Sequence, residues 1–449
     1  MSATFRAVLL ALSLLLSAAP SPAEPAGHSA EQLRQDLRAL RDMIANTHPD
    51  PAHSVPPGRL ESAYADIEAR LRAPMTTDEA WRLLATLNPL FADAHLLVGQ
   101  PDWMGQTAAH LKAGGTLFPY EVQVDAAGEV RIRSELGGAA SPRAGARIER
   151  INGVPARDIA AGLLARMHGD TPEFRAHLLS RRWWFFFWKM HGQSASYELL
   201  LSQRDGGASE LKPASGATPA LLTDDADFDR QFKFELLTDG AALLTLNNFH
   251  WADKARYLDF TGRAFAALRD ARVSTLIIDI RANGGGNDDM WIDGILRYIA
   301  DKPYRWASGY RKKVIQGRAS GTEKVGDVVT GTVDKWVQPE PGHPLRFTGK
   351  TYLLVGRSTY SSAILFANVV QDFGFGKVVG GGYARTSQSG GTQRAVLPNT
   401  GLIVSAPRLI LQRPSGATEP VLLRPDIEMA DDPFDSRAMV DALRARTAR

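Results

Sequence analysis

The stretch TLIIDIRANGGGND, residues 275–288, is the part of the sequence that decides the fold. Its first six residues are mostly isoleucine and leucine, a composition typical of a buried strand. The glycines Gly284, Gly285 and Gly286 follow that strand, and a segment with a helical pattern comes next. Because glycine has no side chain, the backbone amides of this turn can approach a ligand closely, which suits an anion or an oxyanion.

Nucleotide binding is the obvious competing interpretation of this glycine-rich turn. No Gly-Lys-Ser or Gly-Lys-Thr follows the three glycines, which argues against a phosphate-binding P-loop. The GxGxxG spacing of the dinucleotide-binding folds is missing too. The turn by itself therefore indicates a site for negative charge without identifying the ligand.

A second strand-to-helix turn lies in TYLLVGRSTYSSAILFAN, residues 351–368. We expect a strand that ends at Val355 and a helix over 361–373, with Ser361 at the start of the helix. A serine in that position can be an ordinary helix cap. It can also be catalytic, because the helix dipole and the free amides stabilise negative charge that develops beside it. The GxSxG elbow of the α/β-hydrolases is absent, so that family is excluded.

The rest of the segment from 228 to 449 alternates strand and helix patterns, which predicts a layered α/β core. The expected strands are 242–246, 275–280, 351–355, 378–379 and 402–405, and the expected helices are 257–268, 291–299 and 361–373.

Residues 29 to 90 show apolar residues at helical spacing, with Thr76 or Thr77 as the expected cap of one helix. They predict a small helical cap. The stretch NPLFADAHLLVGQ, residues 88–100, places Asp93 and His95 at its end. A lone histidine is more often structural than catalytic, and no HExxH or other close pairing suggests a zinc site.

From about residue 111 the pattern changes to short strands separated by glycine turns. Strands are expected over 117–124, 130–133 and 148–151, a turn at Asn152-Gly153, a helix over 159–167, and a hairpin tip and linker over 203–220. The segment SPRAGARIERINGVPARDI, residues 141–159, resembles part of a PDZ domain.

The run RRWWFFFW, residues 181–188, is the most unusual local composition in the chain. Clustered aromatic residues usually pack an interface between domains. The alternative is an apolar substrate surface or a patch that touches a membrane.

Composition excludes several classes of function. The chain has 449 residues and no cysteine, which rules out disulfides, thiolate metal sites, a cysteine nucleophile and a lipoprotein anchor. A formal net charge of +3 over a chain of this size gives no reason to expect nucleic acid as a partner. Residues 1–23 have the positive start, short apolar run and small residues of a cleaved signal peptide. We therefore expect a periplasmic or secreted protein with no stable membrane anchor after cleavage.

These motifs, in their order along the chain, resemble the C-terminal-processing or tail-specific serine peptidases, in the tricorn-core-like branch. The pieces are HisProAsp at 48–50, AspAlaHis at 93–95, the glycine run at 279–286, ThrTyrSerSerAla at 359–363, and Glu419 ahead of ArgProAspIle at 424–427. The resemblance implies an α+β multidomain fold. Its expected parts are a signal peptide (1–23), a helical cap carrying His95 (24–105), a PDZ-like β-rich module (111–168), a connecting segment (169–227) and a layered, crotonase-like and ClpP-related α/β peptidase core (228–449).

The resemblance also implies a mechanism, carried over position by position. The nucleophile falls on Ser361 and the general base on His95. The carboxylate that orients the base falls on Glu419. The oxyanion donors would be the amide of Ser362 and an amide of the glycine run, Gly284 or Gly285. A peptide or protein substrate is implied, with no metal and no cofactor.

Several alternatives stay open at the level of sequence. A related branch uses a serine–lysine dyad, but the matching stretch, residues 386–392, contains no lysine, which favours His95. Ser358 or Ser362 could be the reacting serine, and Glu419 could be a surface residue. Ile364 stands where the family often has an acid. A catalytically inactive relative that binds peptides or apolar ligands is therefore the main alternative, ahead of a scaffold that acts through the PDZ-like module. The oligomeric state is not indicated.

Overall fold

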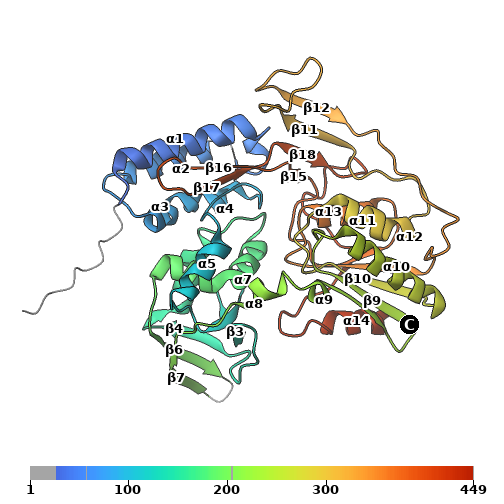
Figure 1. Ribbon diagram of the computed structural model, residues 1–449, viewed down its shortest axis with the longest axis horizontal. Coiled ribbons are helices and arrows are strands. Elements are labelled where there is room, and N and C mark those ends of the chain that lie inside the picture. The colour runs from blue at the N-terminus through green and yellow to red at the C-terminus, as the bar shows by residue number, and fades with distance from the viewer. Residues whose placement is uncertain (1–26, 57, 204–205, 448–449) are drawn as a thin grey trace, which may run out of the picture.

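The computed structural model describes residues 27–56, 58–203 and 206–447 of the chain. The predicted signal peptide lies outside the described residues. The fold is a mixed α+β arrangement of several sheets and helices. In Figure 1 the N-terminal helices and the β-rich module lie on one side of the molecule, and the α/β core that contains β10 lies on the other.

The centre of the α/β core is a six-stranded sheet in the order β19-β14-β13-β10-β9-β8. Neighbouring strands from β9 to β19 run parallel, whereas β8 pairs with β9 in the antiparallel direction. The strands are β8 (Phe232–Leu236), β9 (Ala241–Leu246), β10 (Thr275–Asp279), β13 (Lys350–Val355), β14 (Lys377–Gly380) and β19 (Ile427–Glu428). The strand predicted at 275–280 is thus confirmed, and it lies in the interior of the sheet.

Helices cover both faces of this sheet, as Figure 1 shows. Side chains of β10 alternate between two apolar clusters, with Leu276 and Ile278 in the larger one and Ile277 in the smaller one. This alternation follows from the two-residue period of a strand, and it explains why the strand is apolar throughout. The helices are α10 (Lys254–Asp270), α11 (Asp288–Trp291), a π-helical segment (Ile292–Leu296), α12 (Arg297–Ile299), α13 (Ser362–Asp372) and α14 (Ala438–Thr447).

The direction of the strands decides where the two predicted turns meet. β10 and β13 are parallel neighbours, with Asp279 opposite Leu354. Their carboxyl ends therefore lie at the same edge of the sheet, and the glycine turn and the serine turn that follow them lie next to each other.

The N-terminal part is helical, as predicted. Thr76 caps its third helix in a capping box with Glu79, which decides between the two expected caps. The elements are α1 (Ala30–Thr47), a short 3-10 turn (Pro51–His53), α2 (Arg59–Arg70), α3 (Thr77–Leu84), a second 3-10 turn (Ala85–Leu87), α4 (Asn88–Phe91), β1 (Leu97–Gly99) and α5 (Trp103–Lys112).

Two small sheets built from the C-terminal part connect the two sides of the molecule. β17 (Ile403–Ala406) pairs with β1 and with β16 (Gln393–Val396). Leu397, Leu402 and Val404 share one apolar cluster with the N-terminal helices. Residues of the predicted α/β core (228–449) thus pack with the predicted helical cap (24–105). The second sheet has the order β12-β11-β18-β15, with β11 (Gly309–Lys313), β12 (Val328–Thr332), β15 (Gln388–Gly390) and β18 (Leu409–Gln412).

The β-rich module has an antiparallel sheet in the order β2-β3-β4-β6-β7, with β5 beside β4. Asn152 and Gly153 form the predicted turn between β4 and β5 with φ values of 49° and 77°. The elements are β2 (Tyr120–Val124), β3 (Val130–Glu135), β4 (Arg147–Ile151), β5 (Val154–Pro155), α6 (Ala156–Leu164), α7 (Pro172–His191), β6 (Ser196–Gln203), β7 (Gly206–Pro213), α8 (Ala220–Asp224) and α9 (Phe228–Gln231).

Three details of the module differ from the sequence-based prediction. The strand expected from Leu117 begins at Tyr120, because Leu117 pairs instead with Ser215 in an isolated bridge. The helix expected over 159–167 spans Ala156–Leu164. Residues 206–213 of the predicted tip and linker form strand β7, because this segment satisfies its backbone by pairing with β6 along the whole length of the strand.

The aromatic run belongs to α7, and it packs between the helical cap and the module. Trp183, Trp184 and Phe185 are fully buried. Ring contacts join the run to both sides, with Trp184 against Trp103 and Trp183 against Phe118. The prediction of an internal interface is therefore confirmed, and the exposed apolar surface is not found at Trp183, Trp184 or Phe185.

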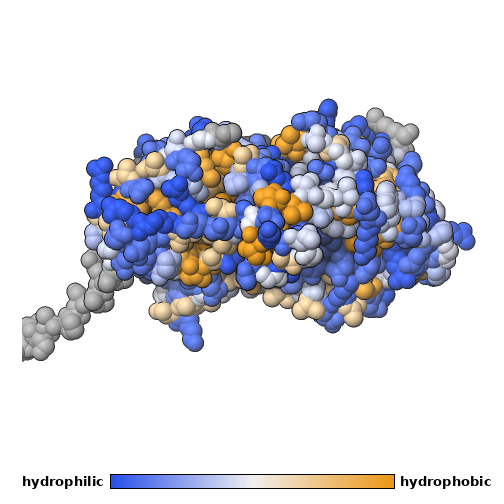
Figure 2. Space-filling view, turned by 90° about the horizontal axis from the view of Figure 1, so that it is seen from above, coloured by the Kyte–Doolittle hydropathy of each residue, from blue (hydrophilic) through white to orange (hydrophobic). Residues whose placement is uncertain are grey.

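The surface seen in Figure 2 mixes hydrophilic residues with several separate apolar patches, the largest of them near the middle of that face. In the described part of the chain, no helix combines the length and the apolar character needed to cross a membrane.

Candidate active site

Ser361 lies between β13 and α13 in a backbone conformation that side chains rarely adopt. Its φ and ψ are 54° and −126°, and it is one of five non-glycine residues with positive φ in the described chain. Such strain concentrates at functional sites. The side chain makes no capping hydrogen bond within the described chain, although Ser361 stands at the cap position of α13. An ordinary helix cap therefore does not explain this serine.

The hydroxyl groups of the two competing serines are engaged elsewhere. The hydroxyl of Ser362 is buried, donates to the Asp288 carboxylate and accepts the indole N–H of Trp291 at 2.9 Å. The hydroxyl of Ser358 lies 2.5 Å from Nε2 of His177.

The hydroxyl of Ser361 is different. It makes no hydrogen bond to any of the described residues, and the residue is partly exposed. Of the three candidate serines, Ser361 is the one whose oxygen is left available.

Burial also changes the pKa of Asp288, the carboxylate that accepts the Ser362 hydroxyl. Desolvation raises the pKa of Asp288, while the hydrogen bonds from Ser362 and Trp291 oppose that rise. Ile364, which stands where the family often has an acid, is buried in the apolar cluster around α13. The exchange of an acid for isoleucine thus fits the local packing.

Asn283 ties the glycine turn to the serine turn. Its buried side chain donates to the Leu246 carbonyl at 2.9 Å and accepts the amide of Gly285 at 2.8 Å. Its backbone carbonyl accepts the amide of Tyr360, which directly precedes Ser361, at 3.2 Å. These bonds fix the distance between the two loops.

Gly285 is required at its position by geometry. Its φ is +107°, and a Cβ atom added there would lie 2.7 Å from Cβ of Ser361 and 3.0 Å from the amide nitrogen of Ser362. A side chain at 285 would therefore fill the space directly beside the side chain of Ser361 and the amide of Ser362.

The predicted oxyanion donors differ in availability. The amide of Gly285 already donates to Asn283. The amides of Gly284 and Ser362 have no acceptor among the described residues. The amide of Ser361 donates to the side-chain carbonyl of Gln388 at 2.9 Å. Of the two glycine amides that the sequence left open, Gly284 is the one free to bind an oxyanion.

His95 lies against the serine turn although it is far away in sequence. Its ring packs on that of Tyr360, with 5.0 Å between the ring centroids. Its Nδ1 atom lies 2.9 Å from the hydroxyl of Ser389 in β15. Burial lowers the pKa of His95, and the nearby Asp93 opposes that shift. The ring is therefore neutral near pH 7, as a general base must be.

Two buried carboxyl groups lie behind His95. Oδ1 of Asp93 accepts the amide of His95 at 2.7 Å and the hydroxyl of Ser389 at 2.9 Å. The hydroxyl of Tyr360 lies 3.3 Å from Asp93 and 3.0 Å from Asp170. Burial, followed by repulsion from Asp93, raises the pKa of Asp170 to about 7.

Glu419 is not brought to this cluster. It is exposed, and its carboxylate accepts the amide of Val421 at 3.1 Å. No hydrogen bond or ion pair joins it to His95 in the described structure. Of the predicted residues, Gly285 lies beside Ser361 and Ser362, whereas His95 packs on Tyr360, the neighbour of Ser361 in the chain, and makes no hydrogen bond to the Ser361 hydroxyl in the described structure.

Sequence reasoning missed the residues of β15. Gln388 contacts the nucleophile turn and Ser389 contacts His95. Both belong to the stretch 386–392, whose lack of lysine was its only informative feature at the level of sequence. The two-residue spacing of Asp93 and His95 was the other available signal, because a carboxylate so placed can accept the amide of the histidine.

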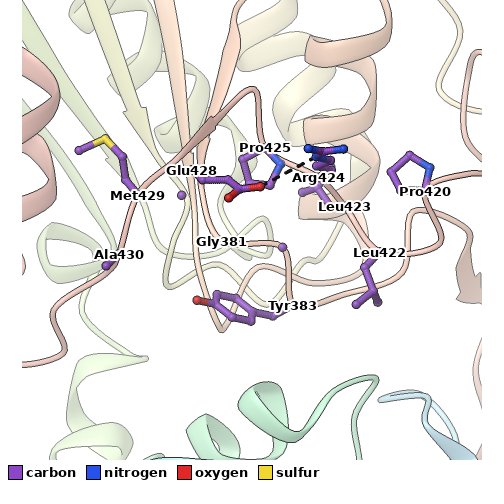
Figure 3. A pocket seen from close by; sticks show the side chains of 12 residues that line it. Gly381, Tyr383, Pro420, Leu422, Leu423, Arg424, Pro425, Glu428, Met429 and Ala430 are labelled. Carbon is purple, nitrogen blue, oxygen red and sulfur yellow. Dashed lines mark ion pairs between the residues drawn. The ribbon is translucent and has the colours of Figure 1, made fainter. Parts of the chain in front are cut away.

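A cavity of about 590 Å³ lies at the carboxyl ends of β14 and β19. Figure 3 shows Tyr383 on one side of it and the ion pair of Arg424 and Glu428 on the other. Neither Ser361 nor His95 lines this cavity, although Pro420, the neighbour of Glu419, does. Within the described ranges, no group of three or more His, Asp or Glu side chains could hold a metal ion.

Comparisons with known proteins agree with the fold. Residues 241–429 match the model of peptidase family S41. Mature CPAF complexed with lactacystin has a similar structure, with a TM-score of 0.66 and 14% identity over 93% of this chain and 97% of that chain. A second structure of mature CPAF is also similar, with a TM-score of 0.63 and 14% identity over 92% of this chain and 96% of that chain. No curated protein sequence matches the chain.

Proposed function

We propose that this chain, a serine-type peptidase that carries a domain of peptidase family S41, is an exported endopeptidase in which Ser361 attacks the peptide bond and His95 is the general base. The observation that carries the proposal is the state of the Ser361 side chain. Its hydroxyl is free of partners in the described chain, sits on a strained turn and adjoins a glycine that leaves room for a ligand.

The proposed reaction starts from a His95 ring that packs beside the serine turn without a hydrogen bond to the Ser361 hydroxyl, so the ring must approach that oxygen when substrate binds. Nε2 of His95 takes the proton of the Ser361 hydroxyl as the oxygen attacks the substrate carbonyl. The amides of Ser362 and Gly284 receive the negative charge on the carbonyl oxygen. The protonated His95 returns the proton to the leaving amine, and an acyl group stays on Ser361. Water, deprotonated by His95, then releases that acyl group.

The family implies peptide or protein substrates. We extend this to unfolded or C-terminal segments that bind in an extended form, since the β-rich module resembles a PDZ domain in its 141–159 segment. The composition of residues 1–23 supports export to the periplasm or the medium. The family resemblance implies that Glu419 orients His95, but in the described structure Glu419 is exposed and accepts the amide of Val421, so the proposed reaction gives it no role.

A fluorophosphonate probe tests the proposal without knowledge of the substrate. Purified protein should be labelled on Ser361, and labelling should be lost in Ser361→Ala. Ser358→Ala is the matched control, because Ser358 is a buried serine three residues away whose hydroxyl contacts His177. Labelling mapped to Ser358 or Ser362, or labelling that persists in Ser361→Ala, would contradict the assignment of the nucleophile.

The alternative of an inactive relative has lost the observations that favoured it. The aromatic residues Trp183, Trp184 and Phe185 are buried in the molecule, so they offer no ligand surface. The side chain of Ile364 is buried in the apolar cluster around α13, so its apolar character is explained by packing. If folded wild-type protein is not labelled, the inactive relative becomes the favoured interpretation.

A further inference from the structure

A continuous chain of hydrogen bonds leads from the His95 ring to a buried carboxylate. Nδ1 of His95 lies 2.9 Å from Oγ of Ser389, and that oxygen lies 2.9 Å from Oδ1 of Asp93. The direct distance from Nδ1 to the same carboxylate oxygen is 4.0 Å, too long for a hydrogen bond. The hydroxyl of Ser389 therefore stands between the histidine and the carboxylate.

The directions of these two bonds follow from counting protons. A hydroxyl has one proton to donate, and an ionised carboxylate can only accept. If Ser389 donates its proton to Asp93, its oxygen must accept from Nδ1 of His95. The neutral ring then carries its proton on Nδ1, and Nε2 has the free lone pair.

We infer that Asp93, acting through the hydroxyl of Ser389, is the positioning group of this site, and that it holds His95 in the tautomer that can deprotonate Ser361. This inference rests on the proposed roles of Ser361 and His95, and it replaces Glu419 as the carboxylate behind the base. Ser389 and Asp93 are positioning residues, because neither one contacts the reacting atoms.

The surroundings of the relay fix its members in place. Asp93 and Ser389 are both buried. Oδ1 of Asp93, which accepts the hydroxyl of Ser389, also accepts the backbone amide of His95. One carboxylate oxygen thus holds both the loop of His95 and the hydroxyl of Ser389. Ser389 is held by the pairing of β15 with β18, in register with Ile410.

The neighbouring residue of the same strand supports the nucleophile. The side chain of Gln388 accepts the amide of Ser361 at 2.9 Å. Two consecutive residues of β15 thus contact the two partners of the reaction, one each. Glu419 has no comparable contact in the described chain and is exposed to solvent.

The test compares the second-order rate of labelling by a fluorophosphonate in the full chain and four variants. A positioned base contributes about 10²–10⁴-fold, so Ser389→Ala and Asp93→Asn should each slow labelling by at least ~10²-fold. Ser389→Thr keeps the hydroxyl and should restore most of the rate. Glu419→Gln should label at the rate of the wild type.

Ser387→Ala is the control for loss of a hydroxyl in the same segment. Its hydroxyl donates to the Leu411 carbonyl at 3.0 Å and does not contact His95. This variant should label at the wild-type rate. A second readout is independent of the rate: ¹⁵N shifts of the His95 ring should report a proton on Nδ1 in the wild type and a mixture of tautomers in Ser389→Ala.

The outcomes separate the inference from the proposed function. Wild-type protein that is not labelled on Ser361 would overturn the proposed function. Wild-type labelling together with an unchanged rate in Ser389→Ala, or a loss in Glu419→Gln alone, would overturn the relay and leave the proposed function standing. If Asp93→Asn fails to fold, Ser389→Ala with its threonine rescue still decides the question.

Discussion

Substitution of Gly285 by alanine tests the geometry of the site most directly. The added methyl group would meet Cβ of Ser361 at 2.7 Å, the carbonyl oxygen of Tyr360 at 2.9 Å and the amide nitrogen of Ser362 at 3.0 Å. The first two distances are shorter than any that Cβ atoms normally show, so the serine turn must shift. Such a shift moves the nucleophile and one of the proposed oxyanion donors together.

Gly285→Ala should affect both the folding free energy and the rate of reaction, and the two effects can be estimated separately. Alanine at a φ of +107° costs about 1–2 kcal/mol of folding free energy, which lowers the melting temperature of a chain of this length by roughly 1–2 °C. Misplacing one oxyanion donor costs about 2.7–4 kcal/mol of activation free energy, or 10²–10³-fold in rate. Gly285→Ala should therefore fold and yet react about 10²–10³-fold more slowly with a fluorophosphonate.

Two further glycines serve as comparisons for this measurement. An alanine Cβ at Gly342 would meet only open space among the described atoms, and φ there is not positive, so Gly342→Ala should label at the wild-type rate. Gly284→Ala also has open space, and it keeps its amide, so its loss should be much smaller than that of Gly285→Ala. A rate in Gly285→Ala within threefold of the wild type would refute the placement of this glycine beside the nucleophile.

Buried groups elsewhere in the chain give three other predictions. Trp183→Ala should destabilise the chain by about 3–5 kcal/mol, because the ring is completely buried, whereas Trp336→Ala, at a side chain that is 45% exposed, should change the melting temperature little. The pKa of Asp170 is raised to about 7, so the folded chain binds one more proton than the unfolded chain between about pH 4 and pH 7. The stability that this group contributes is therefore present at low pH and falls as the pH rises through that window. As the pH is lowered, the melting temperature of the wild type should rise relative to that of Asp170→Asn until the two are equal or the wild type is the more stable. Tyr360→Phe removes the hydroxyl that accepts the amide of Ala94 at 3.0 Å, which should slow labelling of the nucleophile by about tenfold while circular dichroism stays unchanged.

The elements of the core could be predicted from the sequence because their signals are local. The strand at 275–280 is recognisable from its run of apolar residues, and the helix after Ser361 from its composition. Parallel pairing then requires the glycine turn and the serine turn to meet at one edge. The aromatic run favoured burial at an interface, because six consecutive aromatic residues usually pack in such a core.

The contacts of β15, β16 and β17 could not be predicted in the same way. These strands are three or four residues long. β15 and β16 pair with the nearby strands β18 and β17, but β17 also pairs with β1, which is some 300 residues away in sequence. Nothing in a short alternating segment specifies which distant edge it will pair with. The strand at 402–405 could therefore be predicted from the sequence, but its pairing with β1, which connects the two sides of the molecule, could not.

The candidate site also has parts that could be predicted from the sequence and parts that depend on tertiary contacts. The glycine turn and the serine turn were recognisable as local motifs, whereas the roles predicted for Ser361 and His95 came from the family resemblance of the motifs in their order along the chain. The choice of Ser361 over Ser362, of the Gly284 amide over that of Gly285, and of Ser389 with Asp93 behind His95 depends on hydrogen bonds between distant segments. A hydroxyl or an amide is available or occupied only once its partners are in place, so only the tertiary structure could decide which of these groups is free to act.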